Sequence, residues 1–146
     1  MLDLYTAQTA FGDMLSAGEY RSGIIYCVFT ATGFLSMSRY SRTNPGYAAV
    51  TSEGRLLTIQ ANSVEYFMGK SSAAEYYLPS AEKLKIRKTI FGQYAFDCVF
   101  ASYGSRVKVK FQAARKVLGS SAPEQSRNID EFLDMLAKYE IGSEVT

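Results

Sequence analysis

The chain has 146 residues and a net charge of +2, with 16 lysines and arginines, 14 aspartates and glutamates, and no histidine. This length is typical of one domain, and a hydrophobic fraction of 47% excludes a globally disordered chain. The lack of histidine removes Ser-His and Cys-His nucleophiles and most zinc and non-haem iron sites. We therefore predict a binding module rather than an enzyme, with no cofactor and no metal.

The first predicted element is a short amphipathic helix over residues 2–16. One apolar face of it is formed by Leu4, Phe11 and Leu15, with Tyr5 and Met14 at its edges. Gly18 is expected to end this helix. The sequence leaves open whether the apolar face packs on its own domain or on a neighbouring molecule.

Two features bear on the cellular compartment. The first 15 residues carry two aspartates and no basic region, unlike a secretory leader, and the apolar run over residues 23–37 is shorter than the roughly 20 residues of a spanning helix. Cys27 and Cys98 each lie in an apolar run and are interpreted as buried, reduced thiols. A disulfide between them is possible only if their strands meet. We expect a cytoplasmic protein.

The middle of the chain predicts several strands. A buried strand is expected over residues 24–30, followed by a polar loop or edge excursion over 36–45. Residues 47–50 and 55–59 form a hairpin candidate with Gly54 in its turn. Further strands are predicted over 64–68 and 74–78, separated by a break at 69–72, and Pro79 stops the second.

The clearest pattern lies between residues 83 and 111. Apolar and polar residues alternate strictly over 83–87, 94–100 and 106–111. This period of two is typical of strands that bury one face, and the short connections predict a three-stranded antiparallel meander.

The end of the chain predicts one strong helix. Its apolar stripe is Ile129, Phe132, Leu133, Leu136 and Tyr139. Asn128 with Glu131 resembles a capping box at its start, and Ser121 with Glu124 offers an earlier start. Residues 112–121 fit either a frayed helix or a loop, and a frayed tail is expected over 142–146.

Strands followed by one capping helix predict a mainly β fold. Over roughly residues 15–140 the order of several short motifs resembles the bacterial pleckstrin-homology-like (GRAM-like) domains. These motifs are Gly18-Glu19, the hairpin residues 51–57, Leu78-Pro79, Phe91-Gly92, and the closing Ile129, Phe132 and Leu136. The resemblance implies a bent antiparallel sheet or open barrel of about seven strands capped by a C-terminal α-helix. It also implies binding of ligand, lipid or protein, often with self-association, and no catalytic residues. The predicted divisions are a helical extension over 1–17, the domain over 18–141 and the tail.

The alternation in the meander places six cations on its outer face. We call this set the basic face; its residues are Lys83, Lys85, Arg87, Arg106, Lys108 and Lys110. Only Asp97 on the middle strand opposes them, whereas the segment after residue 120 is strongly acidic. The basic face is either a solvated surface that keeps strand edges soluble, a contact with the acidic helix of a second copy, or a site for anionic lipid headgroups or nucleic-acid phosphate. A protein partner or a second copy is the favoured partner, an anionic membrane is the alternative, and nucleic acid is the least favoured.

Two other groups of residues are weighed against function. Tyr66, Phe67, Tyr76 and Tyr77 form an aromatic group that is more typical of a β core than of a pocket. Asp130 and Asp134 lie one helical turn apart on the polar, solvated face of the helix. A general acid–base pair needs a buried or crowded site, so catalysis by these carboxylates is disfavoured. The glycines form neither a dinucleotide-binding nor a P-loop pattern.

Overall fold

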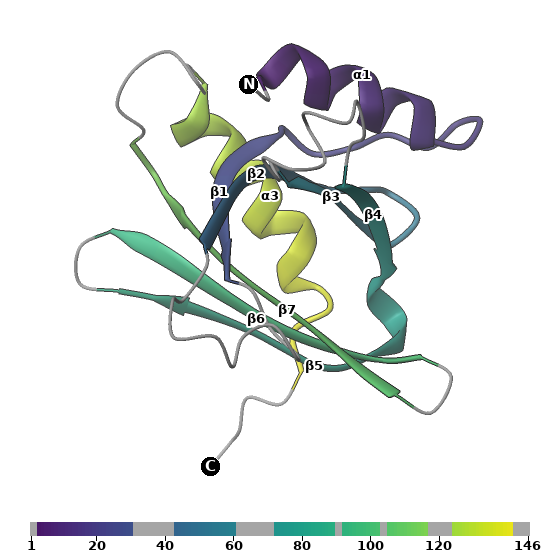
Figure 1. The fold of residues 1–146 in the computed structure, drawn as a ribbon, viewed down its shortest axis with the longest axis vertical. Helices are drawn as coiled ribbons and strands as arrows, with labels where there is room; N and C mark the ends of the chain where they lie inside the picture. The colour runs from purple at the N-terminus through teal and green to yellow at the C-terminus, as the bar shows by residue number, and fades with distance from the viewer. Residues whose placement is uncertain are drawn as a thin grey trace.

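The computed structural model describes residues 3–30, 43–60, 72–89, 92–102, 105–116 and 124–141. Over these residues the chain forms helices at both ends and one antiparallel sheet of seven strands (Figure 1). The helices are α1 (Leu4–Met14) and α3 (Gln125–Ala137), and a 3-10 turn, η2, covers Leu78–Ser80. The strands are β1 (Ile25–Thr30), β2 (Thr43–Val50), β3 (Arg55–Gln60), β4 (Ser72–Tyr77), β5 (Ala81–Lys88), β6 (Gln93–Ser102) and β7 (Ser105–Ala114).

The order of strands across the sheet is β4-β3-β2-β1-β7-β6-β5. β4 and β5 are the two edges and do not pair, so the sheet is bent but does not close into a barrel. The predicted mainly β fold is therefore confirmed, and the meander β5–β6–β7 has β6 in its centre as the alternation predicted. Among the described helices, none is long and apolar enough to cross a membrane.

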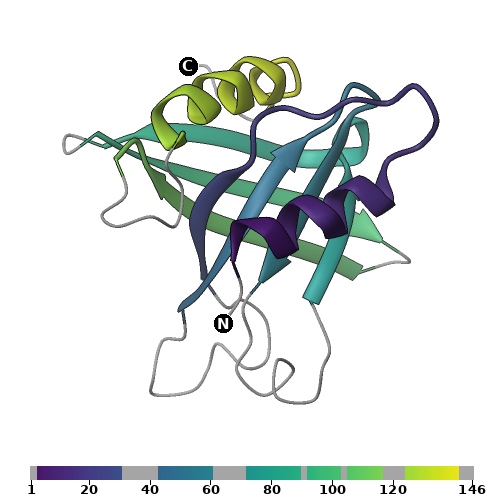
Figure 2. The ribbon, with the colours of Figure 1, turned by 90° about the horizontal axis from the view of Figure 1, so that it is seen from above.

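Two cores lie on opposite sides of the sheet (Figure 2). The larger core packs α3 against the inner face, where Phe96, Phe111 and Phe132 meet with ring centroids 4.6–6.2 Å apart. The smaller core packs α1 against the outer face of β2 and β3, with Ala7 and Phe11 fully buried. The N-terminal helix therefore packs on its own domain, which the sequence had left open.

The helix α1 is shorter than predicted. It begins after Asp3, whose carboxylate accepts hydrogen bonds from the backbone N–H and the hydroxyl of Thr6 at 2.8 and 2.7 Å. It ends at Met14, and Gly18 lies beyond it in a turn with a φ of 80°. Tyr5 is 74% exposed rather than at the edge of the apolar face, because the buried stripe passes through Ala7 and Phe11.

The strand predictions hold with four corrections. β4 begins at Ser72, inside the predicted break, and ends at Tyr77, so Leu78 belongs to the 3-10 turn. Residues 43–45 belong to β2 rather than to a loop, since Pro45 takes the extended conformation and lies opposite Val28. β7 continues to Ala114, so the start of the uncertain segment 112–121 is a strand. The alternation over residues 106–111 predicts Val107 on the core side, opposite to the cations, but it is 37% exposed because it lies close to the β6–β7 turn. Predictions for 36–42, 64–71, 117–121 and the tail lie outside the described residues.

The predicted capping box of α3 is wrong. The helix begins at Gln125, so Asn128 and Glu131 lie inside it. Both side chains instead reach the segment before β1, where Asn128 donates to the carbonyl of Ile24 at 3.0 Å and Glu131 accepts from the N–H of Gly23 at 2.7 Å. A side chain at residue 23 would collide with Asn128, so glycine permits this close approach.

Candidate functional site

The outer face of β5, β6 and β7 carries the largest group of like charges predicted from the sequence. The register places Lys85, Asp97 and Lys110 side by side across the three strands, and Lys83 and Lys108 on either side of Val99 in the next row. Directly opposite side chains in an antiparallel sheet lie about 5 Å apart. The six predicted cations are therefore brought together on one surface, over strands whose other face is core.

Two acids neutralise part of the basic face. Lys83 forms an ion pair with Asp97 at 3.1 Å, and Arg106 forms one with Glu82 at 2.9 Å. Glu82 reaches this surface because the register of β5 shifts between Ala81 and Lys83, an irregularity that the alternation pattern did not reveal. Six cations and two acids leave the face with a net charge of +4.

Three of the six cations have no ion-pair partner among the described residues. They are Lys85, Arg87 and Lys110; Arg87 and Lys110 are exposed, and Lys85 is half-buried. Exposed cations gathered on one face create a field that steers an acidic surface toward it and fixes its orientation. This geometry suits recognition of a broad acidic surface rather than enclosure of a small molecule.

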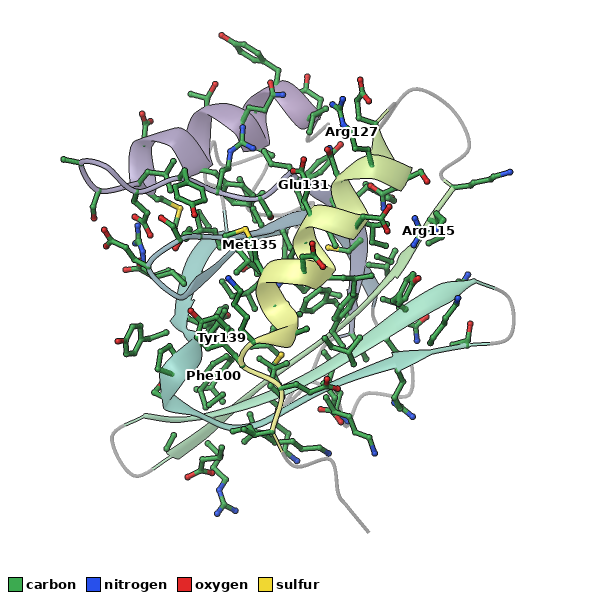
Figure 3. The ribbon with its side chains drawn as sticks, turned by 180° about the vertical axis from the view of Figure 1, so that it is seen from behind. Phe100, Arg115, Arg127, Glu131, Met135 and Tyr139 are labelled. Carbon is green, nitrogen blue, oxygen red and sulfur yellow. The ribbon has the colours of Figure 1, made fainter. Side chains whose placement is uncertain are left out.

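Further cations lie at the end of the meander where β5 and β7 end and β6 begins. Lys88, Arg115 and Lys116 line one hollow of about 510 Å³. Arg115 is turned toward α3 (Figure 3), where it forms an ion pair with Asp130 at 2.9 Å and donates to the hydroxyl of Tyr94 at 3.0 Å. Its charge therefore ties β7 to the helix and adds little to the basic face.

The aromatic group does not form a site. Tyr76 lies on the inner face, half-buried and stacked on Phe100 at 5.3 Å, whereas Tyr77 is 58% exposed. Neighbouring residues of a strand point to opposite faces, which separates the two rings. Tyr66 and Phe67 lie outside the described residues.

The carboxylate pair on α3 also stays apart from any enclosed site. Asp130 is bound to Arg115, and Asp134 is exposed on the same helix. Within the described parts of the chain, no three cysteines or carboxylates cluster as metal ligands would.

The two cysteines are buried free thiols, as predicted. Burial raises the pKa of Cys98 to about 12 and raises the pKa of Cys27 well above its ordinary value. Cys27 lies on β1 and Cys98 on β6, and β7 lies between these two strands in the sheet, so they do not pair. Neither thiol is a nucleophile at neutral pH.

The sequence did not reveal a buried ion pair between Glu19 and Arg55. The carboxylate accepts from Nε of Arg55 at 3.1 Å and from the backbone N–H of Ser16 at 2.9 Å, and its side chain is 0% exposed. Hydrogen bonds from Arg55 lower the pKa of Glu19 to about 2, against the desolvation that opposes ionisation. Arg55 also binds Glu75 and the carbonyl of Met14. The pair thus joins the turn after α1 to the β2–β3 hairpin.

The two residues of this pair lie in the Gly18-Glu19 and hairpin motifs that carry the resemblance to pleckstrin-homology-like domains. Their order was visible in the sequence, but their contact depends on the fold. Comparison with known proteins adds nothing to this resemblance, since the chain matches no protein-family model and no curated protein sequence.

Proposed function

We propose that the protein is a non-catalytic binding or scaffolding module, of the pleckstrin-homology-like type that its sequence resembles, and that the basic face docks an acidic protein surface. The observation that carries this proposal is the net charge of +4 on one rigid face, with Lys85, Arg87 and Lys110 unpaired among the described residues. Such a face accelerates encounter with an acidic partner and fixes its orientation.

The ionisation of the buried groups supports a non-catalytic role. General acids and bases work best when their pKa lies near the operating pH. Here the pKa of Glu19 is lowered to about 2 and that of Cys98 is raised to about 12, so both are moved away from neutrality. Each shift has a structural cause, an ion pair in the first case and burial in the second.

The first partner to consider is a second copy of the chain. On the opposite side of the sheet, α3 and its flanks present five acids (Glu124, Asp130, Glu131, Asp134 and Glu140) against two bases (Arg127 and Lys138). Because the two faces are on opposite sides of one molecule, they cannot meet within a single chain. Contact between copies would be head-to-tail and would build rings or open chains, as a scaffold requires.

Light scattering at low and high salt tests this function. We expect a ring or a series of open chains at low salt that dissociates as salt screens the contact. The double variant Lys85→Glu, Lys110→Glu should be monomeric at both salt concentrations. Lys138→Glu makes the same type of charge change at the end of α3, where it makes the acidic face more acidic, and should keep or strengthen the assembly. A wild-type monomer under all conditions, with no acidic protein bound, would refute the proposal.

The unpaired cations also support a second candidate function, a peripheral adaptor for anionic membrane surfaces. Each exposed Lys or Arg near such a surface contributes about 1 kcal/mol of attraction. Sedimentation with vesicles that contain phosphatidylserine, compared with neutral vesicles, separates this function from self-association. Binding only to the anionic vesicles by a monomeric protein would favour the adaptor.

A further inference from the structure

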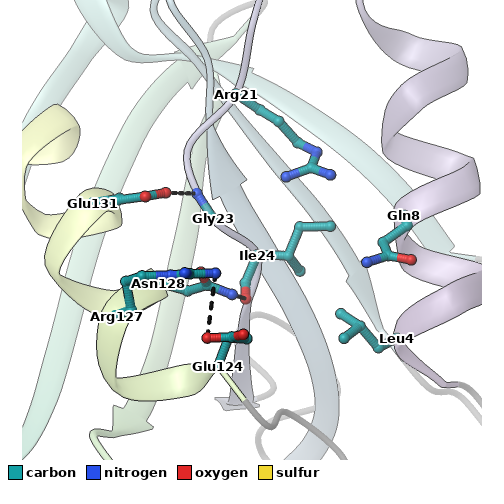
Figure 4. Close-up of a pocket in the computed structure, with 9 residues that line it drawn as sticks. All are labelled: Leu4, Gln8, Arg21, Gly23, Ile24, Glu124, Arg127, Asn128 and Glu131. Carbon is teal, nitrogen blue, oxygen red and sulfur yellow. Dashed lines mark hydrogen bonds and ion pairs between the residues drawn. The ribbon is translucent and has the colours of Figure 1, made fainter.

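A hollow of about 300 Å³ lies between α1 and the first turns of α3, at the segment that leads into β1 (Figure 4). Leu4 and Gln8 of α1 form one wall, and Glu124 and Glu131 on the α3 side form the other. Between them run the residues that lead into β1, including Arg21 and Ile24. This volume is at the lower end of the range for small-molecule sites, about 300–1,000 Å³.

The wall on the α3 side is held in place by polar contacts. Glu131 accepts from the N–H of Gly23 at 2.7 Å through one of its oxygens, and Asn128 donates to the carbonyl of Ile24 at 3.0 Å. Arg127 forms an ion pair with Glu124 at 3.2 Å. The bonds of Glu131 and Asn128 fix the helix against the β1 segment. The Arg127–Glu124 pair is local to the start of α3 and exposed, so it does not add to this attachment.

Arg21 carries a positive charge that none of these contacts neutralises. Its guanidinium points into the space between the helices (Figure 4), and its hydrogen bond goes to the carbonyl of Ser22 at 3.0 Å. None of the described carboxylates forms an ion pair with it. The planar guanidinium has several further N–H groups, and these match a carboxylate in a two-point contact.

The two walls differ in charge. Arg21 extends from the β1 segment toward α1 and the Gln8 amide. On the α3 side Arg127 is paired with Glu124, and Glu131 keeps its second oxygen beside the one bound to Gly23. Half-buried Leu4 gives an apolar surface between them, and Ile24 lies beneath it in the core at 3% exposure. A dianion would be repelled by the acids, and a simple cation would be repelled by Arg21.

We propose that this hollow binds a small zwitterion of the α-amino-acid type. The carboxylate contacts Arg21, the ammonium faces Glu131, and an apolar side chain lies against Leu4. This site contains no residue of the basic face, so its test does not depend on the proposed docking function.

The test is a titration of the isotopically labelled protein with leucine, followed through the backbone amides by NMR. We expect saturable shifts at Gly23, Ile24 and Asn128. 4-Methylpentanoate lacks the ammonium and 3-methylbutylamine lacks the carboxylate, so each should bind at least about tenfold more weakly, a loss of about 1.4 kcal/mol.

Variants separate the two ends of the ligand. Arg21→Gln should weaken leucine at least about tenfold and have little effect on 3-methylbutylamine. Glu131→Gln keeps an oxygen for Gly23 N–H but removes the charge that faces the ammonium, so it should weaken leucine and spare 4-methylpentanoate. Arg106→Gln on the basic face is the matched control and should change nothing. Absence of saturable shifts at these amides would overturn the proposal, as would equal binding of leucine by the wild type and Arg21→Gln.

Discussion

Acidification should weaken the fold through the buried carboxylate of Glu19. Its pKa is about 2 in the folded protein, against 4.5 for a solvated glutamate such as that of the unfolded chain, because Arg55 donates two hydrogen bonds to the charged form. The folded protein thus keeps this group ionised at pH values where the unfolded chain takes up a proton. The contribution to stability is complete above about pH 4.5 and is lost as the pH falls toward 2.

The size of the contribution follows from the shift. The difference between 4.5 and about 2 corresponds to at most about 3 kcal/mol of unfolding free energy. Glu19→Gln removes the charge and leaves the half-buried guanidinium of Arg55 with Glu75 as its remaining carboxylate. We expect the variant to lose most of this amount at pH 7 and to have a shallower decline between pH 4.5 and 2.

Urea unfolding at a series of pH values provides the measurement. Glu75→Gln is the matched control, because Glu75 binds the same guanidinium but its side chain is 52% exposed. Exposed ion pairs contribute about 0–1 kcal/mol, so this control should cost little. Two results would refute the reasoning: parallel pH profiles for the wild type and Glu19→Gln, or an equal loss from the two variants.

Three further predictions concern single side chains. Gln125→Leu should lower the free energy of unfolding by about 2 kcal/mol, because it leaves the N–H of Tyr26 and the carbonyl of Ala114 without their partner. Gln112→Leu is the control in the same denaturation assay and should have little effect, since Gln112 is an exposed side chain of β7. Gly54→Ala should lower the free energy of unfolding more than Gly92→Ala does. Both glycines have φ of 75–80°, a conformation that costs an alanine about 1 kcal/mol. Only at residue 54 would the new Cβ also lie 3.1 Å from the hydroxyl of Tyr139. Cys27 and Cys98 should resist a thiol reagent at pH 8 in the native protein and react after unfolding in urea, since burial keeps both thiols protonated; rapid reaction of the folded protein would contradict their placement.

The sequence predicted the meander best because only one face of it is buried. Alternation over residues 83–87, 94–100 and 106–111 then records directly which side chains face the core and which carry charge. The position of Glu82 was missed because an irregularity in β5 breaks that alternation at one residue. The aromatic pair Tyr76 and Tyr77 was grouped by proximity in sequence, although a strand places neighbours on opposite faces.

Contacts between distant segments left little trace in the sequence. Asn128 and Glu131 matched a local capping pattern, but their side chains bond to Ile24 and Gly23, which lie 104 and 108 residues away. Gln125 had no predicted role at all. Its amide bonds to both polar backbone groups of Tyr26 and to the carbonyl of Ala114, each at 2.9 Å. Such partners are determined by the packing of the helix on the sheet, which a local pattern cannot express.

Gln125 also explains how the sheet can bend without leaving buried polar groups unpaired. β1 pairs with β7 over only three residues, ending at Val28 opposite Gln112, whereas it pairs with β2 over six. Where β1 and β7 diverge, the buried Gln125 amide takes the place of the missing strand partner. The two parts of the sheet on either side of this divergence have different outer faces: α1 covers the first with a second core, and the second carries the cations. Because α1 covers only the part of the sheet that contains β2 and β3, it leaves the basic face on β5, β6 and β7 uncovered. The walls of the proposed zwitterion site lie where α1 and α3 approach the start of β1.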